Sequence, residues 1–171
     1  QLRLASSSRA NVVGWSPQKN LFAWSRDLDT AGTDGWQGGG SGIPVVTTGE
    51  ELAPDGVNTA YTLRGDAGDF ATGGRQWKQD VAVENGGNHT LSVWMKCSSG
   101  ESTVANLMIN NVTGGTGVTV TVTDEWQRFS LTSNVGALTG GGRSGIQINF
   151  SGTNTEVHVA DMQLELSDSA T

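Results

Sequence analysis

Apolar and polar residues alternate at every second position through much of this chain, most clearly from residue 59 onward. Valines alternate with threonines over 118–123, and apolar residues alternate with polar ones over 146–151. Side chains on a β-strand point alternately to the two faces of a sheet, so this period indicates strands with one buried face. No stretch of useful length shows the 3.6-residue period of a helix. The pattern therefore predicts an all-β chain.

Glycine-rich turn signals separate the predicted strands. They occur at 55–56, 73–74, 85–87, 114–115 and 140–142. The strands that we expect cover 43–48, 59–64, 75–83, 89–97, 103–109, 118–123, 128–131, 146–151 and 155–166. About eight to ten short strands at this spacing are typical of an antiparallel β-sandwich or jelly roll.

Strand parity makes two predictions about the run 89–97. Leu91, Val93 and Cys97 all occupy odd-numbered positions, so they have the same parity and lie on one face of the strand. Because the other two are apolar, we expect the single cysteine to be a buried thiol. A single cysteine also excludes an internal disulfide. Trp94 has the opposite parity, and we expect it on the less buried face of its strand or in a second layer.

The last predicted strand changes parity part-way along its length. Val157 and Val159 share one parity, whereas Met162 and Leu164 share the other. A shift of one residue reverses the face of every side chain that follows, so we expect a β-bulge at 160–161. Because bulges re-aim side chains, Asp161 is a candidate functional residue.

The charge balance argues against two classes of partner. The chain has 10 Lys and Arg against 17 Asp and Glu, a formal net charge of −7, and its basic residues occur singly. Nucleic-acid binding needs a basic stripe and is not expected. No apolar stretch approaches the ~18 residues of a membrane span, so membrane insertion is not expected either. Residues 1–10 lack the apolar core of a signal peptide.

A length of 171 residues suits one domain. Residues 1–19 hold a serine triplet and little apolar periodicity. We predict that they form an N-terminal arm or linker that arrives from another domain or docks on a neighbour. Residues 20–171 are predicted to form the jelly-roll sandwich. Within them the glycine-rich stretch 32–42 is expected to be a loop.

Five segments of the chain resemble, in the right order, the galactose-binding-like jelly rolls found as carbohydrate-binding-module-like domains in phage tail proteins and bacterial glycoside hydrolases. They are NLFAWSRDLD at 20–29 with GW at 35–36, WKQDV at 77–81, TLSVWMK at 90–96, EWQRFSLT at 125–132 and ADMQLE at 160–165. The opening segment departs from the usual pattern, because Leu28 replaces an aromatic residue and Asp29 replaces a glutamate.

This resemblance implies a non-catalytic module of a phage virion, of tail-fibre or tailspike type, that binds carbohydrate on the host surface or mediates assembly. Its partners would be cell-surface glycan or other virion proteins, its location the virion or the extracellular space, and its oligomer a homotrimer. One alternative is a structural capsid or tail decoration protein that docks through its N-terminal arm. Another is an accessory carbohydrate-binding module of a bacterial glycoside hydrolase.

The resemblance also implies a structural Ca²⁺ ion. In such domains a carboxylate of the opening segment and one of the closing strand meet around calcium, and the matching positions are Asp29 and Asp161, with Asp27 as a helper. Backbone carbonyls and waters would complete the six to eight oxygen ligands of the ion. In the alternative interpretation, Asp29 caps a turn and Asp161 is a solvated bulge residue.

Tryptophan is the strongest candidate for sugar contact, because its broad ring can stack on the apolar face of a pyranose. The chain has 6 Trp against 1 Tyr. We predict Trp94, Trp36 and Trp77 as ligand-binding residues, the last two because they lie beside glycine-rich loops where exposure is expected. The alternative for each is burial in the core. For Trp126 and Trp24 we expect packing in the core or at its edge.

Catalytic machinery is not expected. Glycosidases place two carboxylates about 5–10 Å apart across a cleft, whereas the adjacent acids at 50–51 and 124–125 would point opposite ways on an extended strand. The histidines His89 and His158 have no spacing that suggests zinc. The chain contains no Gly-x-Ser-x-Gly elbow and no phosphate loop.

Overall fold

The structure is a computed structural model that describes residues 20–22, 36–40, 45–65, 75–81, 87–111, 114–134, 143–149 and 156–166. Within these ranges the chain forms ten strands and no helix. The strands are β1 (Trp36–Gly40), β2 (Val45–Leu52), β3 (Thr59–Arg64), β4 (Arg75–Asp80), β5 (Asn88–Cys97), β6 (Thr103–Asn111), β7 (Gly114–Val122), β8 (Gln127–Asn134), β9 (Arg143–Asn149) and β10 (Glu156–Leu166). The same residues include no helix long and apolar enough to cross a membrane.

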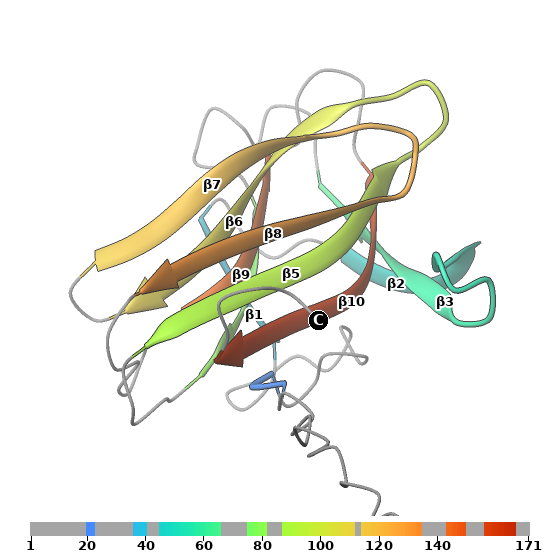
Figure 1. Cartoon of the computed structure of the whole chain (residues 1–171). Helices are drawn as coiled ribbons and strands as arrows, with labels where there is room; N and C mark the ends of the chain where they lie inside the picture. Colours follow the sequence, from blue (N-terminus) through green and yellow to red (C-terminus); the bar gives the residue numbers. More distant parts are fainter. Residues whose placement is uncertain are drawn as a thin grey trace, which may run out of the picture.

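The strands form two five-stranded antiparallel sheets (Figure 1). Sheet A has the order β1-β4-β9-β6-β7, and sheet B has the order β2-β3-β10-β5-β8. Figure 1 shows β8, β5 and β10 of sheet B in front of β6 and β9 of sheet A. The predicted all-β antiparallel sandwich is confirmed.

The main core lies between the two sheets and is built by strand alternation. On β5 the side chains of Leu91, Val93 and Cys97 are fully buried against this core. Leu107 and Ile109 of β6 are buried from the side of sheet A. Full burial of each large aliphatic side chain contributes about 1.5–3 kcal/mol. The prediction that Cys97 is a buried thiol is confirmed.

The predicted β-bulge interrupts β10. The register between β10 and β5 shifts between Ala160 and Gln163, and Asp161 has a φ of 45°. This left-handed conformation is uncommon for a residue with a side chain. The bulge lets Met162 and Leu164 reach the same core that Val157 and Val159 reach before it (both pairs are fully buried).

A second, smaller cluster lies on sheet B. Ala53, Ala60 and Ala160 are buried there, and the half-buried rings of Trp94 and Trp126 pack against them. Ala53 follows the end of β2, so the turn between β2 and β3 folds against the face of sheet B that points away from the main core. The prediction that Trp94 lies in a second layer is confirmed.

The opening segment 20–22 runs beside the second half of β10. The backbone N–H of Leu21 donates to the carbonyl of Leu164 at 2.6 Å. Asn20 Oδ1 accepts hydrogen bonds from the backbone N–H of Phe22 at 3.1 Å and of Leu164 at 3.0 Å. The asparagine therefore ties the start of the domain to its last strand.

Two sequence expectations about glycine-rich segments are wrong. The expected turn signal 114–115 is the beginning of β7, where Gly114 pairs with Asn111. Part of the stretch expected to be a loop, 32–42, is the strand β1, which pairs with β4 over Trp36–Gly40. Backbone hydrogen bonds are sufficient to hold a glycine-rich strand at the edge of a sheet, where one side alone is paired. The predicted arm, 1–19, lies outside the described residues.

Candidate functional site

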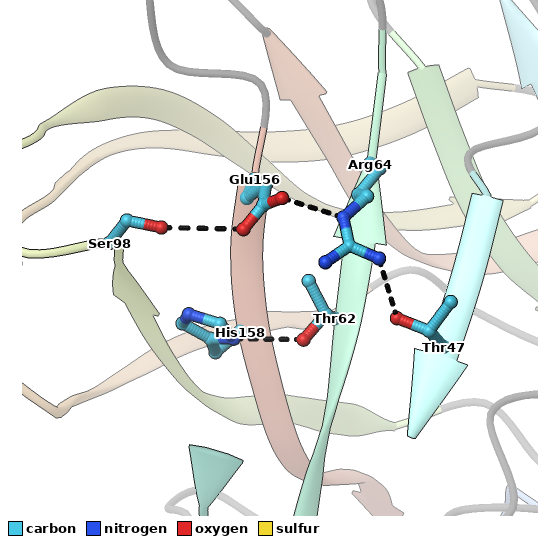
Figure 2. A network of polar contacts seen from close by, with 6 residues as sticks. All are labelled: Thr47, Thr62, Arg64, Ser98, Glu156 and His158. Carbon is cyan, nitrogen blue, oxygen red and sulfur yellow. Dashed lines mark hydrogen bonds and ion pairs between the residues drawn. The ribbon is translucent and has the colours of Figure 1, made fainter. Parts of the chain in front are cut away.

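On the face of sheet B that points away from the main core, polar side chains of β3, β5 and β10 are buried, whereas those of β8 are exposed. Thr62 and His158 are 0% and 6% exposed, and Thr90 and Ser92 are also buried. Figure 2 shows polar side chains of this face pointing toward one another. Thr62 Oγ1 lies 2.9 Å from His158 Nδ1, and Arg64 Nε donates to an oxygen of Glu156 at 2.6 Å. Such mutual contacts are typical of a structural network.

The network continues at its two ends (Figure 2). Arg64 Nη1 donates to Thr47 Oγ1 at 3.1 Å, and Ser98 Oγ donates to the second oxygen of Glu156 at 3.5 Å. It thus links β2, β3 and β10 to the turn after β5. The Arg64 and Glu156 side chains are each about one-third exposed, so this ion pair is expected to add little stability.

Trp94 and Trp126 lie beside this network and are held by local contacts. Trp126 Nε1 donates to the carbonyl of Leu52 at 3.1 Å. Lys96 Nζ lies 5.8 Å from the centroid of the Trp126 ring and 3.2 Å from an oxygen of Glu51. Both rings are half-buried under the β2–β3 turn, which leaves Trp94 a predicted ligand contact with part of its surface accessible.

The expected exposure of Trp77 is wrong. Its side chain is 2% exposed and belongs to the main core. Trp77 lies on the same face of its strand as Gln79 and Val81, which are also buried, and this face points into the core. Trp36 opens β1 with its backbone opposite Gln79, and its side chain lies outside the part of the structure that is described.

The predicted calcium ligands are described only in part. Asp161 sits at the β10 bulge, half-buried, whereas Asp27 and Asp29 lie outside the described residues. Within the described ranges no group of three or more His, Cys, Asp or Glu could hold a metal ion. The pairing of 20–22 with β10 brings the opening segment to the strand that carries Asp161.

Sheet A differs from the centre of sheet B, because the described side chains of β6 and β7 that point away from the core are accessible to solvent. We call this side of sheet A the open face. Gly117, Thr119 and Thr121 of β7 are exposed there, and Asn106 and Met108 of β6 are half-buried. Their neighbours along β6 and β7, of the opposite parity, contribute to the core. Every described side chain on this face therefore has solvent access.

Strand register aligns the backbone positions of four polar residues in a row across sheet A. Asn106 pairs with Thr119 of β7 on one side and with Gln147 of β9 on the other. Gln147 pairs in turn with Gln76 of β4. We call Thr119, Asn106, Gln147 and Gln76 the amide row. Thr119 Oγ1 donates to Asn106 Oδ1 at 2.6 Å.

The row of paired positions next to the amide row includes two glycines. Met108 pairs with Gly117 on β7 and with Gly145 on β9, and Gly145 pairs with Lys78 on β4. Two of these four positions carry no side chain, so the surface beside the amide row is shallow on both sides of Met108. A methionine flanked by glycines, next to a line of hydrogen-bonding residues, suits a ligand that has both apolar and hydroxyl surfaces.

The amino-acid sequence alone does not indicate the amide row. Alternation shows that Asn106 and Gln147 lie on polar faces, but only the pairing of β6 with β9 and of β9 with β4 places them in line. These strands are far apart in the chain, and their register has no local signal.

Comparison with known proteins supports the fold. No protein-family model and no curated protein sequence matches the chain. A bacteriophage CBA120 tailspike protein 4 domain is similar in structure, with a TM-score of 0.58 and 18% identity over 86% of this chain. This chain spans 21% of that tailspike chain.

Two carbohydrate-binding modules are similar over nearly their whole length. TmCBM61, solved with β-1,4-galactotriose, has a TM-score of 0.59 and 15% identity, and the match covers 87% of this chain and 99% of that one. The C-terminal family 22 module of Clostridium thermocellum Xyn10B has a TM-score of 0.58 and 12% identity over 91% of this chain and 100% of that one. The chain therefore has the β-sandwich fold of carbohydrate-binding modules, as the sequence resemblance implied.

Proposed function

We propose that this domain is a non-catalytic carbohydrate-binding domain whose ligand lies on the open face of sheet A. The observation that carries the proposal is the amide row beside the shallow strip at Met108. Side-chain amides both donate and accept hydrogen bonds, which suits the paired donor and acceptor character of sugar hydroxyls. The structural similarity to a family 22 carbohydrate binding module, and to TmCBM61 solved with β-1,4-galactotriose, supports the same function.

The contrast between the two sheets supports this placement. On sheet B the polar side chains of Thr62 and His158 are buried and contact each other. On sheet A the side chains of Asn106 and Thr119 are accessible. A ligand can therefore reach Asn106 and Thr119 without displacing any part of the described fold, whereas access to Trp94 is limited by the β2–β3 turn.

A glycan array followed by calorimetry tests the proposal. The Asn106→Ala variant should weaken binding of the glycan that the array selects by about 5- to 10-fold, since a hydrogen bond contributes about 1 kcal/mol. The matched control is Ser130→Ala, an exposed substitution on β8 of sheet B, which should bind like wild type. No binding on the array, or equal effects of the two variants, would contradict the proposal.

The setting that we propose is a phage appendage of tail-fibre or tailspike type, in the virion and as a homotrimer, with host-surface glycan as the partner. The tailspike similarity supports this setting. The two alternatives remain a virion structural protein and an accessory module of a glycoside hydrolase. Light scattering that gives a trimer mass would support the appendage, and a strictly monomeric chain would favour the accessory module.

We also propose a structural calcium ion held by Asp161 with Asp29 and Asp27. Two observations support Asp161: its carboxylate is a hard oxygen ligand, and the hydrogen bonds of Asn20 and Leu21 to β10 hold the opening segment against the strand that carries it. Addition of a chelator should lower the melting temperature of the wild type and leave that of Asp161→Asn almost unchanged. An equal response of both proteins, or none in the wild type, would exclude Asp161 as a ligand.

A further inference from the structure

The hydrogen bond between Thr119 and Asn106 joins two accessible side chains on neighbouring strands of the open face. Thr119 Oγ1 donates to Asn106 Oδ1 at 2.6 Å. The two residues are also direct register partners, so their Cβ atoms lie side by side on one face. The contact lies outside the core, and it fixes the orientation of the Asn106 side-chain amide.

An asparagine amide has two different ends. Its oxygen accepts hydrogen bonds, and its nitrogen donates two. Because Oδ1 is turned toward Thr119 on β7, Nδ2 lies at the end of the planar group that points away from β7. The neighbour of Asn106 on that side is Gln147 of β9 in the same row.

We infer that Thr119 is a positioning residue for the saccharide site, which rests on the proposed function. Its hydroxyl holds the Asn106 amide so that the site presents N–H donors to the ligand. The ligand atom recognised at this position is then an acceptor oxygen: the lone pair of a hydroxyl, or an acyl carbonyl. A side chain that is already fixed loses less conformational freedom when the ligand binds.

Calorimetry with the glycan selected by the array tests this role through three substitutions. Thr119→Val keeps the shape of the side chain and removes its donor, and it should weaken binding by about 2- to 10-fold. Thr119→Ser keeps the hydroxyl and should bind close to wild type. The matched control is Thr48→Val on β2 of sheet B, an exposed threonine for which no change is expected.

A double-mutant cycle separates positioning from direct contact. If Thr119 acts through Asn106, then Thr119→Val should cause no further loss in an Asn106→Ala background. Asn106→Asp, which has the same shape but no N–H donor, should bind at least as weakly as Asn106→Ala. Loss of affinity in both backgrounds would mean that Thr119 touches the ligand itself and would overturn the inference.

The failures of the two proposals can be told apart. If Asn106→Ala weakens binding while Thr119→Val does not, the amide does not need Thr119 and only the positioning role is wrong. If Asn106→Asp binds like wild type, the oxygen end contacts the ligand and the donor assignment is wrong. If the wild type binds glycan and Asn106→Ala has no effect, the site is not on sheet A, and both proposals fail.

Discussion

The bulge in β10 makes a sharp stability prediction about two adjacent residues. Met162 is fully buried in the main core, whereas Gln163 is half-buried on the other face, where its Oε1 accepts a hydrogen bond from Arg128 at 2.9 Å. Replacement of a buried methionine by alanine costs about 2–5 kcal/mol through lost burial and the cavity that remains. Gln163→Ala removes one partly solvated hydrogen bond and should cost about 1 kcal/mol or less.

Urea unfolding followed by tryptophan fluorescence measures this difference. For a domain of this size the free energy of unfolding falls by about 2 kcal/mol per M urea. Met162→Ala should therefore lower the midpoint by about 1–2.5 M, and Gln163→Ala by about 0.5 M or less. Without the bulge, the parity of Val157 and Val159 would continue and bury Gln163 in place of Met162. Equal shifts, or a larger shift for Gln163→Ala, would refute the bulge.

Three further substitutions test the packing of sheet B. Thr62→Val removes a buried partner of His158 and should lower stability by about 1–3 kcal/mol, and Thr62→Ser should recover most of it. Ala160→Leu should overpack the small cluster and cost about 1–3 kcal/mol in the same unfolding assay. Lys96→Met breaks a partly exposed ion pair with Glu51 and should change stability by less than about 1 kcal/mol, with no difference left in 1 M salt.

Much of the fold follows from features that are local in the sequence. Two-residue alternation predicts the strands, and parity correctly separates the buried Cys97 from the half-buried Trp94. The change of parity between Val159 and Met162 predicts the bulge, because only a displaced register lets both reach one core. Each of these inferences needs no knowledge of which strands are neighbours.

The errors come from two sources. The glycine-rich neighbourhood of Trp77 suggests exposure, but the ring shares its face of the strand with Val81, and this stronger signal places it inside. The glycines of β1 suggest a loop, because glycine has a low strand propensity. Propensity is a property of the single segment and does not include the backbone hydrogen bonds that pairing with β4 provides. The amide row depends on pairings between strands that are distant in sequence, so alternation alone could not show it.

The central claim is that the open face of sheet A is the ligand-binding surface, and an NMR titration tests it most directly. Two-dimensional ¹H–¹⁵N spectra would be recorded while the glycan selected by the array is added to the wild-type domain. We expect the backbone and side-chain amide signals that shift to belong to β4, β6, β7 and β9, with the Asn106 side chain among them. Shifts concentrated on β5, β8 and β10, around Trp94 and Trp126, would contradict it.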